Sequence, residues 1–175
     1  MLDLRDDPGG IVDQAILVAD QFLDDGTIVT IRGRQGSVEN QVAHKGGTGV
    51  GVPIIALVDQ GTASASEILA AALHDHGRAT LVGLPTYGKG TVQTFYDLDD
   101  GSGLKLTTAR YLTPKGNSLE SKGIVPDVRV DAFTPEEIVA GGGAGSGSDA
   151  TMKESDADDP QLAAAVQQAR QALRR

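Results

Sequence analysis

The sequence contains no cysteine and no tryptophan, and aromatic residues make up only 3% of its 175 residues. The absence of cysteine excludes a disulfide framework, a thiolate nucleophile and a zinc site built on thiolates. Because aromatic rings are scarce, a hydrophobic core has to be built from Leu, Ile, Val and Ala. Apolar residues reach 39%, which is enough for one globular domain of this length.

Positive charge is also scarce, since 15 Lys and Arg face 24 Asp and Glu and the net charge is -9. Nucleic acids and anionic membrane surfaces both require a basic protein surface, so we expect neither as a partner. No apolar run approaches the roughly 20 residues of a membrane-spanning helix, so no membrane insertion is expected. Met1 is followed at once by Leu2–Arg5, without the apolar stretch of a signal peptide.

The hydrophobic pattern predicts alternating strands and helices, and therefore an α/β fold. Largely apolar runs at 52–58 and 79–82 are typical of buried strands in a mostly parallel sheet. Residues 33–50 carry five glycines and are expected to form a loop with a loose hairpin. Further strands are expected at 2–4, 27–31, 91–98 and 104–112, an extended segment at 125–128, and helices at 11–23 and 63–73.

The C-terminal part divides into a linker and a helix. Residues 141–148 are Gly and Ser apart from Ala144, which predicts a flexible acidic linker over 132–158. Pro160 follows two candidate caps, Asp158 and Asp159, and an apolar stripe at helical spacing runs from Leu162 to Leu173. We expect residues 1–131 to form the core and 159–175 to form an appended helix. Such a helix has to pack somewhere, and a homo-oligomer assembled through it is one expectation.

The chain also opens unusually, because Leu2–Leu4 resembles the end of a core strand that runs directly into a turn. We therefore expect a fragment of a longer protein, and a short native start is the alternative.

Three segments carry residues suited to chemistry. In the first, Gly61–Ile68, a serine lies where a buried strand passes into a helix, and the free N–H groups there favour negative charge. Helix capping is the alternative role for such a serine. The hydroxyls of Thr62, Ser64 and Ser66 are, however, more than one cap requires.

The second segment places Lys89 between two glycines at the start of a strand, with Thr91 and Gln93 on the same face. An exposed, solvated lysine is the simpler interpretation; burial would instead favour the neutral amine, which can act as a base. Gln93 could hold that amine by a hydrogen bond. The third segment, Asp7–Gly10, is either an ordinary tight turn or a set of backbone N–H groups presented to an anion.

Taken in order, these segments resemble the carboxy-terminal processing (tail-specific) protease family. The resemblance covers about residues 2–131 and implies a serine endopeptidase with the spiral β-sheet that such proteases share with the crotonase-like superfamily. The matching segments are Leu2–Gly10, Ala63–Ile68, Tyr87–Gln93, Thr108–Tyr111 and Gly123–Val128.

Carried over by this resemblance, Ser64 matches the nucleophile, Lys89 its general base and Gln93 the residue that orients the lysine. The N–H groups of Gly10 and Ala65 match the oxyanion hole. The implied reaction is acyl transfer on proteins or their C-terminal tails, with no metal or organic cofactor. The resemblance also implies a location outside the bacterial cytoplasm or in the thylakoid lumen.

The sequence departs from the family pattern in several places. Asp7 stands where Asn is usual, Leu84 replaces a common Glu and Tyr87 replaces Phe. The family usually carries a PDZ domain before the strand that Leu2 begins, and we expect this fragment to lack it, which makes a catalytically silent binding or assembly module the main alternative. A crotonase-type acyl-CoA enzyme, which would not use Lys89, is a third possibility.

The remaining polar candidates are weaker. His74 and His76 lie two residues apart on one helix and so face different sides, and His44 is the only other histidine, so no metal site is expected. His74 is also roughly 15 Å along the helix from Ser64, too far to be its base. Glu67 is expected to support the site or the helix start, Arg5 and Asp3 to fix the turn by an ion pair, and Arg110 to pair with an unidentified carboxylate.

Overall fold

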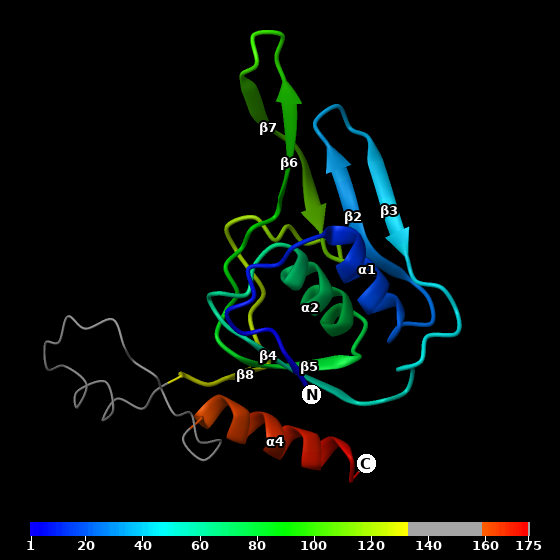
Figure 1. Ribbon diagram of the computed structural model, residues 1–175. Helices are drawn as coiled ribbons and strands as arrows, with labels where there is room; N and C mark the ends of the chain where they lie inside the picture. The colour runs from blue at the N-terminus through cyan, green and yellow to red at the C-terminus, as the bar shows by residue number, and fades with distance from the viewer. Residues whose placement is uncertain (133–158, 175) are drawn as a thin grey trace, which may run out of the picture.

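Two four-stranded sheets organise the protein, one parallel and one antiparallel, as the computed structural model shows for residues 1–132 and 159–174 (Figure 1). The parallel sheet has the order β1 (Leu2–Asp3), β4 (Ile54–Val58), β5 (Ala79–Gly83), β8 (Val128–Arg129). The antiparallel sheet has the order β3 (Val38–Val42), β2 (Thr27–Gly33), β7 (Gly103–Leu112), β6 (Thr91–Asp97). The helices of the described residues are α1 (Val12–Asp20), α2 (Ala65–Asp75) and α4 (Pro160–Ala172).

The α/β class is confirmed, but the expectation of a mostly parallel sheet is wrong, because the strands divide equally between the two sheets. The loose hairpin expected within residues 33–50 is a regular one, in which β3 pairs antiparallel with β2. Most of β3 is exposed on both faces, so its sequence lacks the apolar alternation that identifies a strand. β7 then joins β2 rather than extending the parallel sheet.

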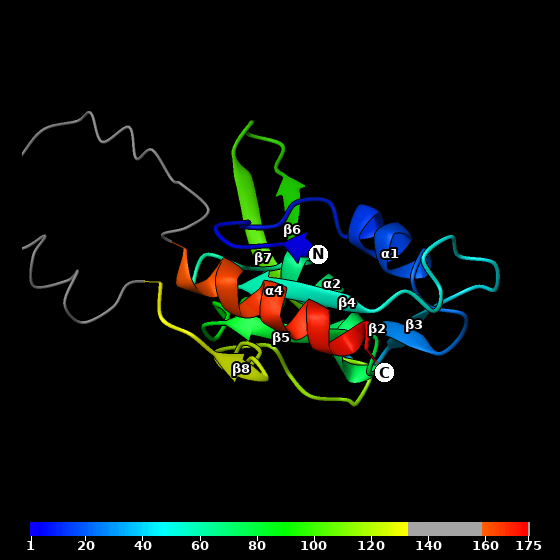
Figure 2. The same cartoon turned by 90° about the horizontal axis from the view of Figure 1, so that it is seen from below.

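The C-terminal helix α4 covers the outer face of the parallel sheet, as Figure 2 shows from below. Its Ala165 is buried in a cluster with Ile55 and Leu57 of β4 and Val82 of β5. At its start, Asp159 accepts a hydrogen bond from the Leu162 N–H at 2.9 Å and so caps the helix. In the described residues the apolar stripe of α4 thus lies on this chain's own sheet, and a homo-oligomer assembled through this helix stays a prediction. The proposed linker lies outside the described residues except for Ala132.

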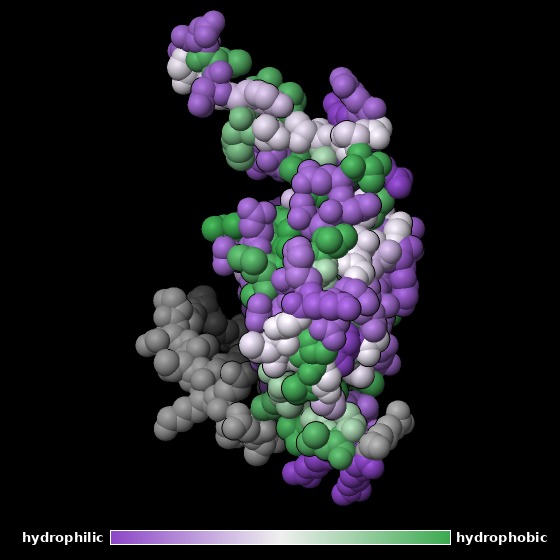
Figure 3. Space-filling model, turned by 90° about the vertical axis from the view of Figure 1, so that its right-hand side faces the viewer, coloured by the Kyte–Doolittle hydropathy of each residue, from purple (hydrophilic) through white to green (hydrophobic). Residues whose placement is uncertain are grey.

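A long hairpin of β6 and β7 stands out from the body and forms the uppermost projection in Figure 3. Hydrophobic side chains lie exposed on it among hydrophilic ones, including Phe95, of which 70% is exposed. No helix in the described ranges is long and apolar enough to cross a membrane.

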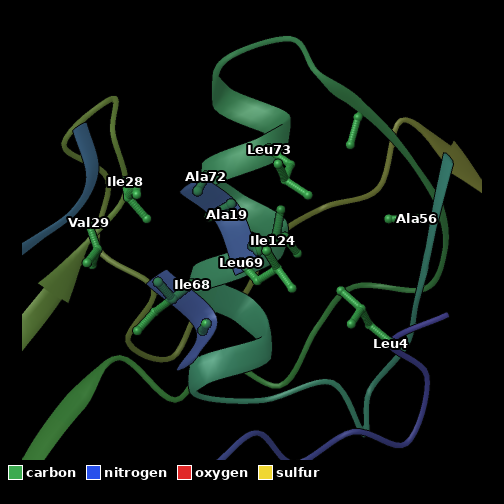
Figure 4. Close-up of a cluster of buried hydrophobic side chains, with 14 of the residues drawn as sticks. Leu4, Ala19, Ile28, Val29, Ala56, Ile68, Leu69, Ala72, Leu73 and Ile124 are labelled. Carbon is green, nitrogen blue, oxygen red and sulfur yellow. The ribbon is translucent and has the colours of Figure 1, made fainter. Parts of the chain in front are cut away.

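Helix α2 lies between the two sheets and forms the centre of the core (Figure 4). Residues 65–73 of this helix are all buried. Its run of alanines lets α1, β2 and β5 approach closely, while Ile68, Leu69 and Leu73 fill the remaining space. Because α2 is held on every side, the residue at its N-terminus has a fixed position.

Candidate active site

Ser64 occupies the tight turn between β4 and α2, with a backbone geometry unusual for a helix cap. Its φ is 57° and its ψ is -117°, whereas cap residues normally adopt the β region. A non-glycine residue at positive φ is strained and persists only where the surrounding structure holds it. Strained serines at strand-to-helix turns are the form in which α/β-hydrolases expose their nucleophile. The backbone of Ser64 therefore favours a nucleophile over a simple cap.

The side chain of Glu67 holds this turn in place from inside the protein. It is completely buried, and its Oε2 accepts the Ser64 N–H at 3.0 Å and the Lys89 N–H at 2.8 Å. Its Oε1 accepts the Gly88 N–H at 2.8 Å and the Thr86 hydroxyl. Four donors and no acceptor surround the group, an arrangement that suits the ionised carboxylate. A single side chain thus brings the Ser64 and Lys89 backbones together.

The sequence contained a signal for this role. Ser64 and Glu67 have the spacing of a capping box, in which a glutamate three residues after the cap accepts the cap's own N–H. The structure shows that bond, and it shows in addition that the same carboxylate reaches the loop before β6, 21 and 22 residues further along the chain. The second connection could not be found from local spacing.

The turn at Pro8–Gly10 lies directly against Ser64. Gly9 has φ 81°, and a side-chain carbon added to it would come within 2.6 Å of the Ala63 carbonyl oxygen and 2.7 Å of the Ala65 nitrogen. Only glycine permits this approach. Asp7 fixes the turn, since its carbonyl accepts the Ala63 N–H at 2.9 Å and its carboxylate accepts the Gly9 N–H at 3.0 Å. The carboxylate of Asp7 is therefore engaged by backbone.

Two backbone donors beside Ser64 have no partner among the residues that the structure describes. Within residues 1–132 and 159–174, nothing accepts a hydrogen bond from the N–H of Gly10 or of Ala65. A pocket of about 220 Å³ opens next to them, lined in part by apolar side chains of α1 and α2 such as Ala15, Val18 and Leu69. Unpaired N–H groups at the mouth of a small pocket are suited to receiving an anionic oxygen.

Lys89 and Gln93 lie near the site but are not joined in this structure. The Lys89 side chain is exposed, and no hydrogen bond links it to Ser64 or Gln93 in the described part of the chain. The Gln93 amide donates instead to Thr107 Oγ1 at 2.8 Å and to Thr91 Oγ1 at 3.3 Å. The catalytic set of Ser64, Lys89 and Gln93 therefore stays a prediction. The structure brings the backbones of Ser64 and Lys89 together but does not join the side chains.

The ion pair expected between Arg5 and Asp3 is confirmed at 2.8 Å. A hydrogen bond from Arg5 is the main reason why the pKa of Asp3 is lowered, and the same bond raises the pKa of Arg5. Arg5 also donates to Asp159 at 2.6 Å and to Gln161 at 3.3 Å, at the start of α4. Arg5, which lies between β1 and the Pro8–Gly10 turn, is thus bound to the start of α4, a contact that the sequence did not indicate.

His74 is not part of the site. It lies in the last turn of α2, and its Nε2 is 3.0 Å from Asp127 Oδ1. Thr62, one of the two other hydroxyls in the Gly61–Ile68 segment, donates to the Leu4 carbonyl at 2.7 Å in a buried position. The hydrogen bonds of His74 and Thr62 give both side chains a structural role.

A strained serine at a helix start beside two unpaired N–H groups defines the class of site found in serine hydrolases. The family model described as "Peptidase family S41" matches residues 1–130, and the chain belongs to this family. This confirms the resemblance drawn from the sequence motifs.

Three known proteins illustrate the similarity. A carboxy-terminal-processing protease of Bartonella bacilliformis is 47% identical over 157 residues, which are 89% of this chain and 35% of that protein. A carboxyl-terminal-processing protease of Synechocystis sp. is 47% identical over 131 residues, 75% of this chain and 30% of the relative. The solved structure of a photosystem II D1 C-terminal processing protease is 42% identical with a TM-score of 0.72, covering 74% of this chain and 34% of that one. The chain thus spans about a third of the length of these relatives.

Proposed function

We propose that residues 1–131 form the catalytic core of a serine endopeptidase that cleaves protein substrates or their C-terminal tails. The observation that carries the proposal is the strained backbone of Ser64, held by Glu67 beside the unpaired N–H groups of Gly10 and Ala65. The names of the relatives, which are C-terminal processing proteases, support the same substrate class.

In the proposed reaction, the Lys89 amine takes the proton of the Ser64 hydroxyl as Oγ attacks the peptide carbonyl carbon. The oxyanion that forms accepts hydrogen bonds from the N–H groups of Gly10 and Ala65. The tetrahedral intermediate collapses, the protonated Lys89 gives its proton to the leaving amine, and an acyl-enzyme remains. Water, activated by the neutral amine, then hydrolyses this ester and frees Ser64. No metal or organic cofactor takes part.

The exposed position of Lys89 requires a further step. A lysine acts as a base only as the neutral amine, which removal of water favours. A peptide lying along the start of β6 would cover Lys89 and the Ser64 turn together, because Glu67 holds their backbones side by side. We propose that the bound substrate removes water from the amine and brings it to Ser64.

The test compares variants of two serines that lie two residues apart at the start of α2. Ser64→Ala is expected to abolish hydrolysis of an unfolded casein-type substrate, whereas Ser66→Ala, which changes a buried hydroxyl two residues further on, should retain it. Both proteins should unfold at similar temperatures. Cleavage by the Ser64→Ala protein at the parent rate would refute the proposed mechanism.

A catalytically silent binding or assembly module is the second candidate. The observation in its favour is that Lys89 is exposed and makes no hydrogen bond to Ser64 within the described residues. A fluorophosphonate probe separates the two: covalent labelling that disappears in Ser64→Ala supports the peptidase. A folded chain that is never labelled supports the silent module.

We also propose that the two sheets are successive turns of the spiral sheet expected from the family resemblance. The packing of α2 against β2 of one sheet and β5 of the other supports this arrangement. The location of the full-length protein outside the cytoplasm stays a prediction from the resemblance.

A further inference from the structure

Three arginines lie together in a pocket that none of the proposed chemistry uses. The pocket has a volume of about 370 Å³, within the range of small-ligand sites. It is lined by Arg32 near the end of β2, Arg34 in the turn that follows and Arg110 from β7, and the turn at Gly116–Ser118 borders it. We call this the arginine pocket.

The pairing of the strands places the three side chains on one face of the antiparallel sheet. Arg32 lies directly opposite Arg110, and the Arg34 N–H donates to the Thr108 carbonyl at 3.2 Å, which continues the same ladder. The neighbouring pair, Ile31 and Tyr111, faces the hydrophobic core. Because side chains alternate along strands, the arginines project from the opposite, outer face.

The arrangement is costly unless it serves a ligand. Like charges directly opposite each other destabilise a sheet, and here two guanidinium groups occupy such a pair while a third lies on the same face. No carboxylate of the described residues lies within 4.0 Å of any of the three. The chain as a whole is acidic, with a net charge of -9, so a concentration of unpaired arginines is not a matter of composition.

We propose that the arginine pocket binds a carboxylate of the peptide substrate, either an acidic side chain or the free C-terminus. Guanidinium groups match carboxylates with paired hydrogen bonds, which gives orientation as well as attraction. Several arginines on a rigid sheet are held ready for such a contact. The proposal deepens the peptidase function and rests on it for the identity of the ligand.

The position of the pocket relative to Lys89 supports this ligand. Arg110 lies opposite Thr91, two residues beyond Lys89, and the Gly90 carbonyl accepts the Tyr111 N–H at 2.8 Å. With ordinary strand spacings, the Cα atoms of Lys89 and Arg110 are about 8 Å apart. A carboxylate roughly two to four residues from the attacked carbonyl would therefore reach the pocket from an extended peptide.

The experiment measures binding without cleavage, using the full chain with Ser64→Ala and calorimetry. The probes are four twelve-residue peptides of one sequence, with two adjacent Glu or two Gln and with a free or an amidated C-terminus. Removing the carboxylate that is recognised should weaken binding about tenfold or more. Loss with Gln identifies a side chain, and loss with the amide identifies the terminus. Equal binding of all four peptides would overturn the proposal.

Variants connect that loss to the pocket. Arg32→Gln and Arg110→Gln should each weaken binding of the recognised peptide about tenfold and leave binding of the carboxylate-free peptide unchanged. Arg170→Gln, an equal change of charge on the exposed face of α4, serves as control and should bind like the parent. Because each pocket variant relieves a like-charge pair, neither should lower the unfolding temperature. Unchanged binding in both pocket variants would refute the assignment.

The outcome is separable from that of the peptidase proposal. Carboxylate-dependent binding in a chain that never hydrolyses a substrate would uphold the pocket and reject the enzyme. Hydrolysis that does not depend on acidic residues of the substrate, on its C-terminus or on Arg110 would uphold the enzyme and reject the pocket.

Discussion

Replacing Glu67 by glutamine would substitute an amide nitrogen for one oxygen of a carboxylate that accepts four hydrogen bonds. The favoured orientation keeps the remaining oxygen on the side of the Ser64 and Lys89 N–H groups. The new nitrogen then faces the Thr86 hydroxyl and the Gly88 N–H. The Thr86 oxygen already accepts the Ile124 N–H at 2.8 Å, and a hydroxyl has room for a second donor.

The expected loss in the free energy of unfolding follows from counting the hydrogen-bond donors that lose their acceptor. In Glu67→Gln the Thr86 hydroxyl turns and accepts from the amide, so the Gly88 N–H and the hydroxyl's own hydrogen both lose their acceptor. Each such group costs about 1–3 kcal/mol, so the expected loss is about 2–6 kcal/mol. In Glu67→Ala all four donors are left unpaired, at about 4–12 kcal/mol. That cost is comparable to the whole stability of a domain of this size, about 5–15 kcal/mol. We therefore expect the glutamine variant to fold and the alanine variant to be largely unfolded.

Urea unfolding followed by circular dichroism measures both values. Glu39→Gln is the control, because Glu39 is exposed and makes one contact, accepting from Gln41 at 2.7 Å; its stability should stay within about 0.5 kcal/mol of the parent. A Glu67→Gln protein as stable as the parent, or a Glu67→Ala protein that keeps its fold with little loss, would show that this carboxylate does not hold the two segments together.

Two further predictions concern the neighbouring elements. Gly9→Ala should lower kcat roughly 10²–10³-fold, because the added carbon collides with the Ala63–Ala65 backbone and displaces one oxyanion donor. Gly101→Ala, with the same φ of 81° but open space around it, should retain activity, and equal losses in the two variants would contradict this reasoning. Burial alone would raise the pKa of Asp159, but hydrogen bonds from the Leu162 N–H and from Arg5 outweigh it and leave that pKa lowered. The stability that Asp159 contributes is thus present above its unfolded pKa of about 3.9 and is lost as the pH falls through the lower folded value. Asp159→Asn, which can still cap α4, should therefore show a shallower loss of unfolding temperature between pH 5 and pH 2, and parallel curves would count against the ion pair.

The elements that were predicted from sequence are those whose burial leaves a strong pattern. The apolar runs of β4 and β5 and the stripe of α1 identify themselves, and the motifs around Ser64, Lys89 and Gly10 were recognised in their correct order. Proximity in space was not predictable from any of these patterns. The Glu67 carboxylate and the contact of Arg5 with Asp159 join residues 22 and 154 positions apart, and no local spacing encodes such a pair.

Two further features, the strand β3 and the surface that α4 covers, were not predicted because local patterns do not encode them. β3 is exposed on both faces and therefore shows no alternation. The apolar stripe of α4 was recognised, but a stripe does not tell which surface it covers. The sequence of β4, which is completely buried, indicates the surface that α4 covers. Its two faces are both apolar: Ile54, Ala56 and Val58 face the α2 core, and Ile55 and Leu57 face outward. A strand apolar on both faces requires a second helix, and α4 is that helix.

The covering of β4 by α4 has a consequence for the order in which the chain can mature. During synthesis, the strands and α2 leave the ribosome well before residue 160, so the outward side chains of β4 and β5 stay exposed to water until the thirteen-residue helix α4 has been made. Since Arg5, beside the turn that supplies Gly10, binds the first turn of that helix, a segment that is translated 154 residues later completes the surroundings of this turn.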